Sequence, residues 1–166
     1  IHMKGFRNFD DEEIIFHGKT LIIGANDVGK TNLIYALRLL FDKSISERDL
    51  ELSDSDYNAY SGTSQIEITV TITGIVEECL LSTFGGSVKD GTLLIRYTNS
   101  KNDTYRLLVG FSEETLTEIT TRQYIRRLNM QCVDTNREQI GSLKHERIQM
   151  LRLAKEKLAE EAEAED

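Results

Sequence analysis

The sequence has 166 residues, 39% of them hydrophobic and 29% charged, with a formal net charge of −8. That length supports one domain with its own core, and no apolar run approaches the roughly 20 residues of a membrane span. No signal peptide is visible, and the acidic balance argues against a dedicated nucleic-acid-binding module, which is usually basic. We therefore expect a cytoplasmic protein with no membrane partner.

The chain opens with IHMKGFRNF, in which apolar and polar residues alternate as in a strand. A His-Met pair near a start can also be a cloning remnant that lies outside the fold. Residues 13–24, EIIFHGKTLIIG, predict a hairpin that turns near residues 17–19. Its second arm would be a short, buried strand over residues 21–23, directly before the next motif.

Residues 24–31, GANDVGKT, fit the phosphate-binding pattern G-x-x-x-x-G-K-[ST]. Gly24 and Gly29 would let the backbone take turns that a side chain forbids, so that the N–H groups between them converge on an anion. Lys30 would bring a cation to the terminal phosphates, and the hydroxyl of Thr31 would ligate Mg²⁺. The motif thus predicts ATP and Mg²⁺ as ligands.

The stretch that follows the motif, TNLIYALRLLFDK, predicts a helix to about Lys43, with no glycine or proline to interrupt it. Its apolar face is formed by Leu33, Ile34, Leu37, Leu40 and Phe41. A strand, a loop and a helix in this order are the context that a phosphate loop requires. The alternative is a glycine-rich turn with an incidental surface lysine.

The remainder of the chain predicts mostly antiparallel strands and short helices. We expect a polar loop over residues 44–64, a half-buried strand over 65–74, a helix over 75–84, a hairpin over 91–111 that turns at 100–103, a short helix over 120–128, a short strand over 130–135 and one long helix from residue 137. A regular alternation of strands and helices, as in a parallel sheet, is not seen. The fold class is therefore α/β with a mixed, largely antiparallel β-rich part.

Two smaller features have plain structural interpretations. Residues 122–127, RQYIRR, hold three arginines, for which a solvated helix face is a better interpretation than contact with a phosphate backbone. Cys79 and Cys132 are far apart in apolar surroundings, which is typical of buried thiols in a cytosolic protein.

Several motifs resemble those of one family. The opening IHMKGFRNF is similar to the first strand of SMC/RecF-type ATPases of the ABC class, which favours the strand over the cloning remnant. GANDVGKTN, with Asn26 and Asn32, resembles the G-x-N-x-x-G-K-[ST]-N form of those proteins and is most similar to the OLD-family ATPases, which include the Gabija-type ATPase-nuclease of anti-phage defence. The acidic-aromatic pair in SDSDYNAYSGTSQIEITVTI also resembles that family, and the resemblance covers about residues 1–74.

The resemblance implies a P-loop NTPase of ABC/SMC-like fold, with an N-terminal lobe over residues 1–136 and an exiting helix over 137–166 that leads to a dimerisation or coiled-coil insert. It also implies which residues touch ATP. Lys30 and Thr31 would act on the β- and γ-phosphates and on Mg²⁺, and Asn32 follows them in the motif. Further contacts would come from the backbone of Asn26, Asp27, Val28 and Gly29, from Arg7 and Asn8 beside a phosphate or the base edge, and from a Q-loop glutamine, for which Gln139 is the first candidate and Gln131 the second. An ordinary polar surface residue is an equal alternative for either glutamine.

Other family motifs are not recognisable in the chain: the Walker B run, the signature motif, the switch histidine and the Toprim acid cluster. We therefore expect the N-terminal part of an ATPase that pairs as a homodimer or with its own C-terminal half, as the ATPase module of an OLD-like DNA-processing nuclease, in one setting anti-phage defence. DNA would be met through the parent protein. Two alternatives stay open: a complete small nucleotide switch with Asp134 as its Walker B residue, and a non-enzymatic interaction module with a vestigial loop.

Overall fold

The computed structural model describes residues 1–132 and residue 150. Two units are distinguished, Ile1–Gln131 and Cys132–Asp166, and everything that follows concerns the first. The predicted long helix from residue 137, Asp134 and Gln139 all lie outside the described residues, and so does most of the predicted strand over 130–135. Within the described part, no helix is long and apolar enough to cross a membrane.

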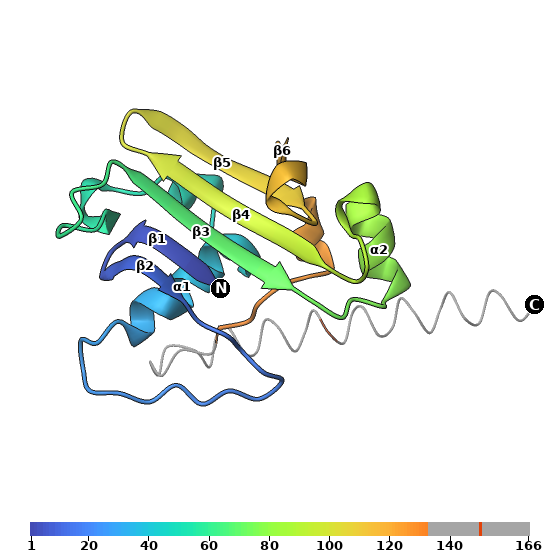
Figure 1. Ribbon diagram of the computed structural model, residues 1–166, viewed down its shortest axis with the longest axis horizontal. Coiled ribbons are helices and arrows are strands. Elements are labelled where there is room, and N and C mark those ends of the chain that lie inside the picture. The colour runs from blue at the N-terminus through green and yellow to red at the C-terminus, as the bar shows by residue number, and fades with distance from the viewer. Residues whose placement is uncertain (133–149, 151–166) are drawn as a thin grey trace, which may run out of the picture. The chain divides into compact units, whose positions relative to one another are not determined.

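The first unit is built on an antiparallel sheet of six strands in the order β2-β1-β3-β4-β5-β6 (Figure 1). The strands are β1 (His2–Phe6), β2 (Phe9–Glu13), β3 (Gln65–Ile72), β4 (Leu93–Ser100), β5 (Asp103–Gly110) and β6 (Thr117–Ile119). The strands expected at the N-terminus, over 65–74 and in the hairpin over 91–111 are confirmed. The edge strand β6 was not predicted, because three residues are too few to show a period.

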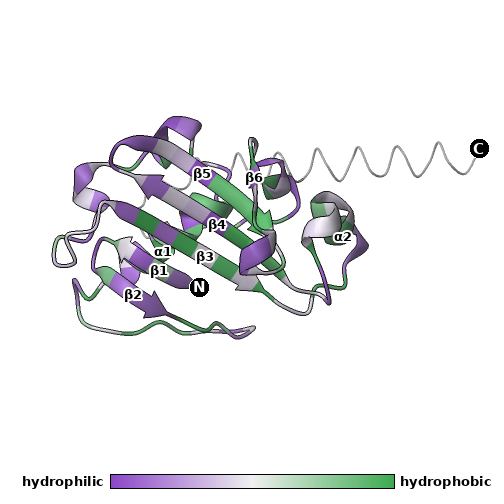
Figure 2. Cartoon of the chain, turned by 45° about the horizontal axis from the view of Figure 1, so that its top comes forward, coloured by the Kyte–Doolittle hydropathy of each residue, from purple (hydrophilic) through white to green (hydrophobic). Residues whose placement is uncertain are grey.

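Core residues on one face of the sheet align across four strands. Met3 pairs with Ile68, Ile68 with Tyr97 and Tyr97 with Leu107, and none of the four side chains is more than 3% exposed. The period-two alternation that predicted β3 places these residues on the same face. Figure 2 shows this alternation as hydrophobic and hydrophilic bands along β3 and β4.

Helix α1 (Lys30–Phe41) covers this face and contacts β4 (Figure 1). Its buried side chains are spaced at three and four residues, so they form one stripe that packs into the same cluster as the sheet residues; they are Leu33, Ala36, Leu39, Leu40 and Phe41. A shorter helix, α2 (Glu78–Phe84), ends at Gly85. Both helices were predicted.

The segment after residue 111 closes the far end of α1. A 3₁₀ turn, Gln123–Arg126, buries Tyr124, whose hydroxyl donates to the carbonyl of Leu40 at 2.8 Å. Burial raises the pKa of Tyr124 to about 12, so the phenol keeps this hydrogen bond at physiological pH. Arg122 donates to the carbonyl oxygens of Asp42 and Ile45, so this arginine belongs to the fold rather than to a solvated helix face.

Three predictions were wrong. The hairpin over residues 13–24 does not form: β2 instead pairs with β1, and residues 14–25 run as a coil (Figure 1). Leu21 and Ile23, expected in a buried strand, are 83% and 80% exposed, because no strand of the described part lies beside them. Cys79 and Cys132 are exposed rather than buried, since α2 has no buried residue.

A pair of leucine substitutions tests this arrangement. Leu39→Ala removes a side chain with 0% exposure from the core and is expected to lower the free energy of unfolding by about 2–5 kcal/mol. Leu21→Ala removes the same atoms from an exposed position and is expected to change it by less than about 0.5 kcal/mol. Urea unfolding followed by circular dichroism measures both, and equal losses would mean that residues 21–23 are buried in this chain after all.

Candidate nucleotide-binding site

The predicted phosphate loop lies directly before α1 and has the backbone of an anion-binding nest. Asp27 has a φ of 64° and Gly29 a φ of 101°, and left-handed residues of this kind turn successive N–H groups toward one point. Gly24, predicted to supply a turn of this type, is outside the left-handed region. A Cβ atom there would lie 2.9 Å from Cγ2 of Val28, so Gly24 serves close packing instead, and Asp27 provides the second left-handed turn.

Gly29 is required for two reasons. Its φ of 101° suits a residue without a Cβ atom, and it caps the N-terminus of α1. A Cβ atom would also stand 2.3 Å from Nδ2 of Asn8. The β1–β2 turn therefore packs directly against the last residue of the phosphate loop.

Lys30 is the first residue of α1, and its side chain folds back over the loop. Its Nζ donates to the carbonyl oxygens of Gly24 at 2.9 Å and Ala25 at 2.5 Å. Lys30 thus closes the loop on itself and holds its ammonium group beside the nest. A phosphate that enters the nest finds this cation already near.

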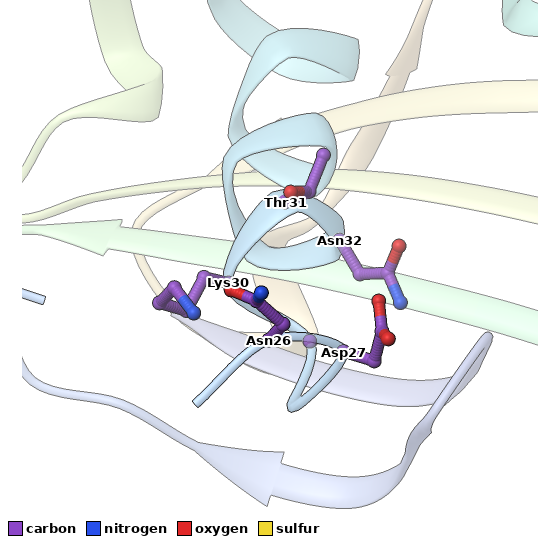
Figure 3. A pocket seen from close by; sticks show the side chains of 6 residues that line it. Asn26, Asp27, Lys30, Thr31 and Asn32 are labelled. Atoms are coloured by element: carbon purple, nitrogen blue, oxygen red, sulfur yellow. The ribbon is translucent and has the colours of Figure 1, made fainter. Parts of the chain in front are cut away.

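A pocket of about 460 Å³ opens over the loop. Figure 3 shows the side chain of Lys30 on one side of the loop, and Asp27 and Asn32 together on the other. The hydroxyl of Thr31 forms no hydrogen bond within the described residues and is exposed, so it is available as a metal ligand. These donors fit a nucleotide phosphate with Mg²⁺; the lining residues are Asn26, Asp27, Gly29, Lys30, Thr31 and Asn32.

Arg7 joins three elements beside the pocket. It sits in the β1–β2 turn with a φ of 49°, and its Nε and NH2 atoms both lie 2.8 Å from Oδ1 of Asp56. Its NH1 donates to Oδ1 of Asn32 at 2.9 Å, and the guanidinium lies over the ring of Tyr35 at 4.3 Å. Because these contacts use the guanidinium fully, Arg7 is held in one position.

Asn32 continues this chain of hydrogen bonds to the phosphate loop. Its Nδ2 donates to Oδ1 of Asn8 at 2.7 Å, and Asn8 in turn packs on Gly29. The structure therefore brings together Arg7, Asn8 and Asn32 with the loop, as predicted.

Asp56 anchors the outer end of the chain. It closes a 3₁₀ turn, Asp54–Asp56, in which its Oδ2 accepts from the backbone N–H and the hydroxyl of Ser53 at 2.9 and 2.8 Å. Burial by itself would raise the pKa of this carboxyl, but the hydrogen bonds from Ser53 and Arg7 outweigh it, so the pKa of Asp56 is lowered. The ionised form is therefore the one that stabilises the fold.

Asp56→Asn is expected to lower the free energy of unfolding at neutral pH by about 1–3 kcal/mol, the usual worth of hydrogen bonds to a charged group. A lowered native pKa gives stability that is complete above the unfolded value near 3.9 and is lost as the pH falls through the native value. The difference between wild type and variant should therefore be full above about pH 5 and shrink below about pH 4. Urea unfolding across this range measures it.

Asp54→Asn is the matched control, because Asp54 is exposed in the same turn and forms no side-chain hydrogen bond within the described residues. It should change stability by less than about 0.5 kcal/mol. A difference for Asp56→Asn that persists unchanged down to pH 3 would contradict the role of the ionised carboxylate.

Sequence reasoning missed Asp56 and Tyr35 as parts of the site. Asp56 belongs to the acidic-aromatic pair noted at Asp56–Tyr57, but nothing in the sequence says that this loop reaches back to Arg7, 49 positions away. Gln131, the second Q-loop candidate, is exposed and lies in an irregular segment rather than a strand. The Q-loop assignment of Gln139 stays a prediction.

Comparison with known families places this geometry. The family model described as "AAA ATPase domain" matches residues 1–164, so the chain belongs to that family. Together with the relatives and the fold below, this confirms the resemblance to the SMC/RecF-type and OLD-like ATPases.

Two kinds of curated relative are similar to parts of the chain. The endonuclease GajA of Bacillus cereus (strain VD045) is 44% identical over 72 residues, which are 43% of this chain and 12% of that protein. The DNA replication and repair protein RecF of Synechococcus sp. (strain JA-2-3B'a(2-13)) is 36% identical over 84 residues, 49% of this chain and 21% of that protein. The chain thus spans between an eighth and about a fifth of these relatives.

A solved structure shares the fold. It comes from work on ATP-driven dimerization and DNA-stimulated activation of SMC ATPases, with a TM-score of 0.51 over 76% of this chain and 74% of that chain, at 18% identity. At this identity the likeness shows the fold alone. The ABC/SMC-like lobe with an antiparallel sheet is confirmed, while the predicted long helix lies outside the described residues.

Proposed function

We propose that this chain binds ATP with Mg²⁺ through the loop over residues 24–31 and acts as the ATPase module of an OLD-like DNA-processing protein. The observation that carries the proposal is the loop geometry: a nest at Asp27 and Gly29, closed by Lys30 at the start of α1. The N-terminal partial charge of the helix adds to the attraction for phosphate. The family match supports the same assignment.

Each residue of the loop has a distinct task in this proposal. Backbone N–H groups between Asn26 and Gly29 bind the phosphate oxygens, and Lys30 moves from the carbonyls of Gly24 and Ala25 toward the terminal phosphates. The hydroxyl of Thr31 binds Mg²⁺, which supplies neutralisation of the phosphate charge. Asn8, Asn32 and Arg7 form the wall next to Gly29.

The same proposal includes a completing partner, either the rest of the polypeptide or a second copy. Leu21 and Ile23 are exposed on an extended segment, and residues 21–23 form no backbone hydrogen bond within the described part. A continuous apolar run is typical of a strand buried on both faces of a parallel sheet. We propose that strands from outside this chain cover it, which is supported by the greater length of the relatives.

The setting of the parent protein is taken from its relatives. GajA is named an endonuclease and RecF a DNA replication and repair protein, so we propose a DNA-processing nuclease, with anti-phage defence as its context and ATP-dependent dimerisation as its switch. DNA cleavage by the parent protein, measured with ATP, without nucleotide and with a non-hydrolysable analogue, tests this part. Cleavage that ignores the nucleotide would refute it.

Direct binding tests the central statement. Calorimetric titration of the purified protein with ATP, in Mg²⁺ and again in EDTA, should give one site, with Mg²⁺ required for tight binding. The absence of any heat or of competition by ADP would remove the assignment.

A further inference from the structure

The side-chain amide of Asn8 faces the phosphate loop with its donor end, and this orientation is set from a distance. We infer that Arg7 and Asn32 are positioning residues that fix Asn8 as a hydrogen-bond donor for the bound phosphate. The inference rests on the proposed function, since it names how one wall of that same site is oriented. Three steps carry it.

The first step is the chemistry of arginine. A guanidinium has N–H donors and no acceptor, so whatever it contacts must accept. Arg7 is held by Asp56, at 2.8 Å from two of its nitrogens, and by the ring of Tyr35. It cannot turn away, and its NH1 therefore fixes the carbonyl end of the Asn32 amide toward itself at 2.9 Å.

The second step transfers this polarity along the chain. With Oδ1 of Asn32 facing Arg7, its Nδ2 faces the opposite way and donates to Oδ1 of Asn8 at 2.7 Å. An amide has one oxygen end and one nitrogen end. Asn8 must then present its Nδ2 on its other side.

The third step places that donor at the site. Nδ2 of Asn8 stands 2.3 Å from the position that a Cβ atom of Gly29 would occupy, and Gly29 lines the pocket. Nδ2 forms no hydrogen bond within the described residues, so it is free to donate to a phosphate oxygen. The reverse orientation would place a carbonyl oxygen there, which repels an anion.

Asn32→Asp tests the orientation with almost no change in shape. The carboxylate keeps the bond to Arg7, but its second oxygen can only accept, so Asn8 must rotate and donate to it. Asn8 then presents Oδ1 to the phosphate. We expect Asn8→Ala to weaken ATP binding about 3- to 10-fold, the worth of one hydrogen bond, and Asn32→Asp to weaken it further.

A double-mutant cycle separates the orientation from the added charge. If Asn32→Asp acts through Asn8, its effect on the Kd of ATP should be at least about threefold smaller in the Asn8→Ala background. Asn129→Asp adds the same charge at an exposed position near the other end of α1, where Met130 bonds to Phe41, and should leave the Kd unchanged. Equal effects of Asn32→Asp in both backgrounds would overturn the inference.

Side-chain amide NMR decides the same question without nucleotide. The Asn8 NH₂ resonance, assigned by its loss in Asn8→Ala, should move downfield in Asn32→Asp, because it now donates to a carboxylate. An unchanged resonance would also overturn the inference. If Asn32→Asp does not fold, Asn8→Asp replaces the donor directly and should bind ATP more weakly than Asn8→Ala. If wild type itself binds no ATP, the proposed function fails, while the resonance still reports the orientation.

Discussion

Lys30→Ala is expected to weaken ATP binding by at least about 30-fold, which corresponds to about 2 kcal/mol. The ammonium of Lys30 is held over the phosphate loop by the carbonyls of Gly24 and Ala25. Its contact to phosphate is charge-assisted and belongs to the stronger class of hydrogen bonds. Alanine removes the cation and leaves the terminal phosphates without it.

The same substitution should leave the fold intact. Both bonds of Lys30 go to exposed carbonyls of its own loop, so the free energy of unfolding should change by less than about 0.5 kcal/mol. Lys43→Ala, at an exposed position just past α1, is the control for a lost positive charge and should bind ATP as wild type does. Calorimetry measures both, and wild-type affinity in Lys30→Ala would rule out the loop as the nucleotide site.

The second expected result concerns turnover: the 166-residue chain should bind ATP and hydrolyse it very slowly. Its pocket supplies Lys30, Thr31 and backbone donors, which act on ground and transition states alike and so do little for the rate. Asp27 is the one carboxylate among the lining residues, and it lies on the loop itself. Groups that act mainly in the transition state would come from the completing partner.

The size of this effect follows from phosphoryl transfer in general. A charged group supplied in trans is worth about 10³–10⁵ in rate, so addition of the partner polypeptide should raise steady-state turnover by a factor in that range. Lys30→Ala should then abolish it again. Rapid hydrolysis by the chain alone, sensitive to Lys30→Ala, would instead favour a complete nucleotide switch.

The nucleotide site was predictable wherever its chemistry is local. The spacing of glycines, Lys30 and Thr31 predicted the loop, because the turns, the cation and the hydroxyl all lie within eight consecutive residues. The period of 3.6 residues predicted α1, and the period of two predicted β3 and the β4–β5 hairpin. These signals depend on neighbours in sequence, so the sequence by itself determined them.

The tertiary structure decided what depends on partners far along the chain. Residues 21–23 carry the sequence of a buried strand, yet they are exposed, because a strand forms only where another backbone is present to pair with it. The path from Asp56 through Arg7 and Asn32 to Asn8 joins residues up to 49 positions apart, and no spacing rule encodes such contacts. The residue types of the phosphate loop were written in the sequence, while the orientation of the amide beside it was fixed by the packing of three separate elements around one arginine.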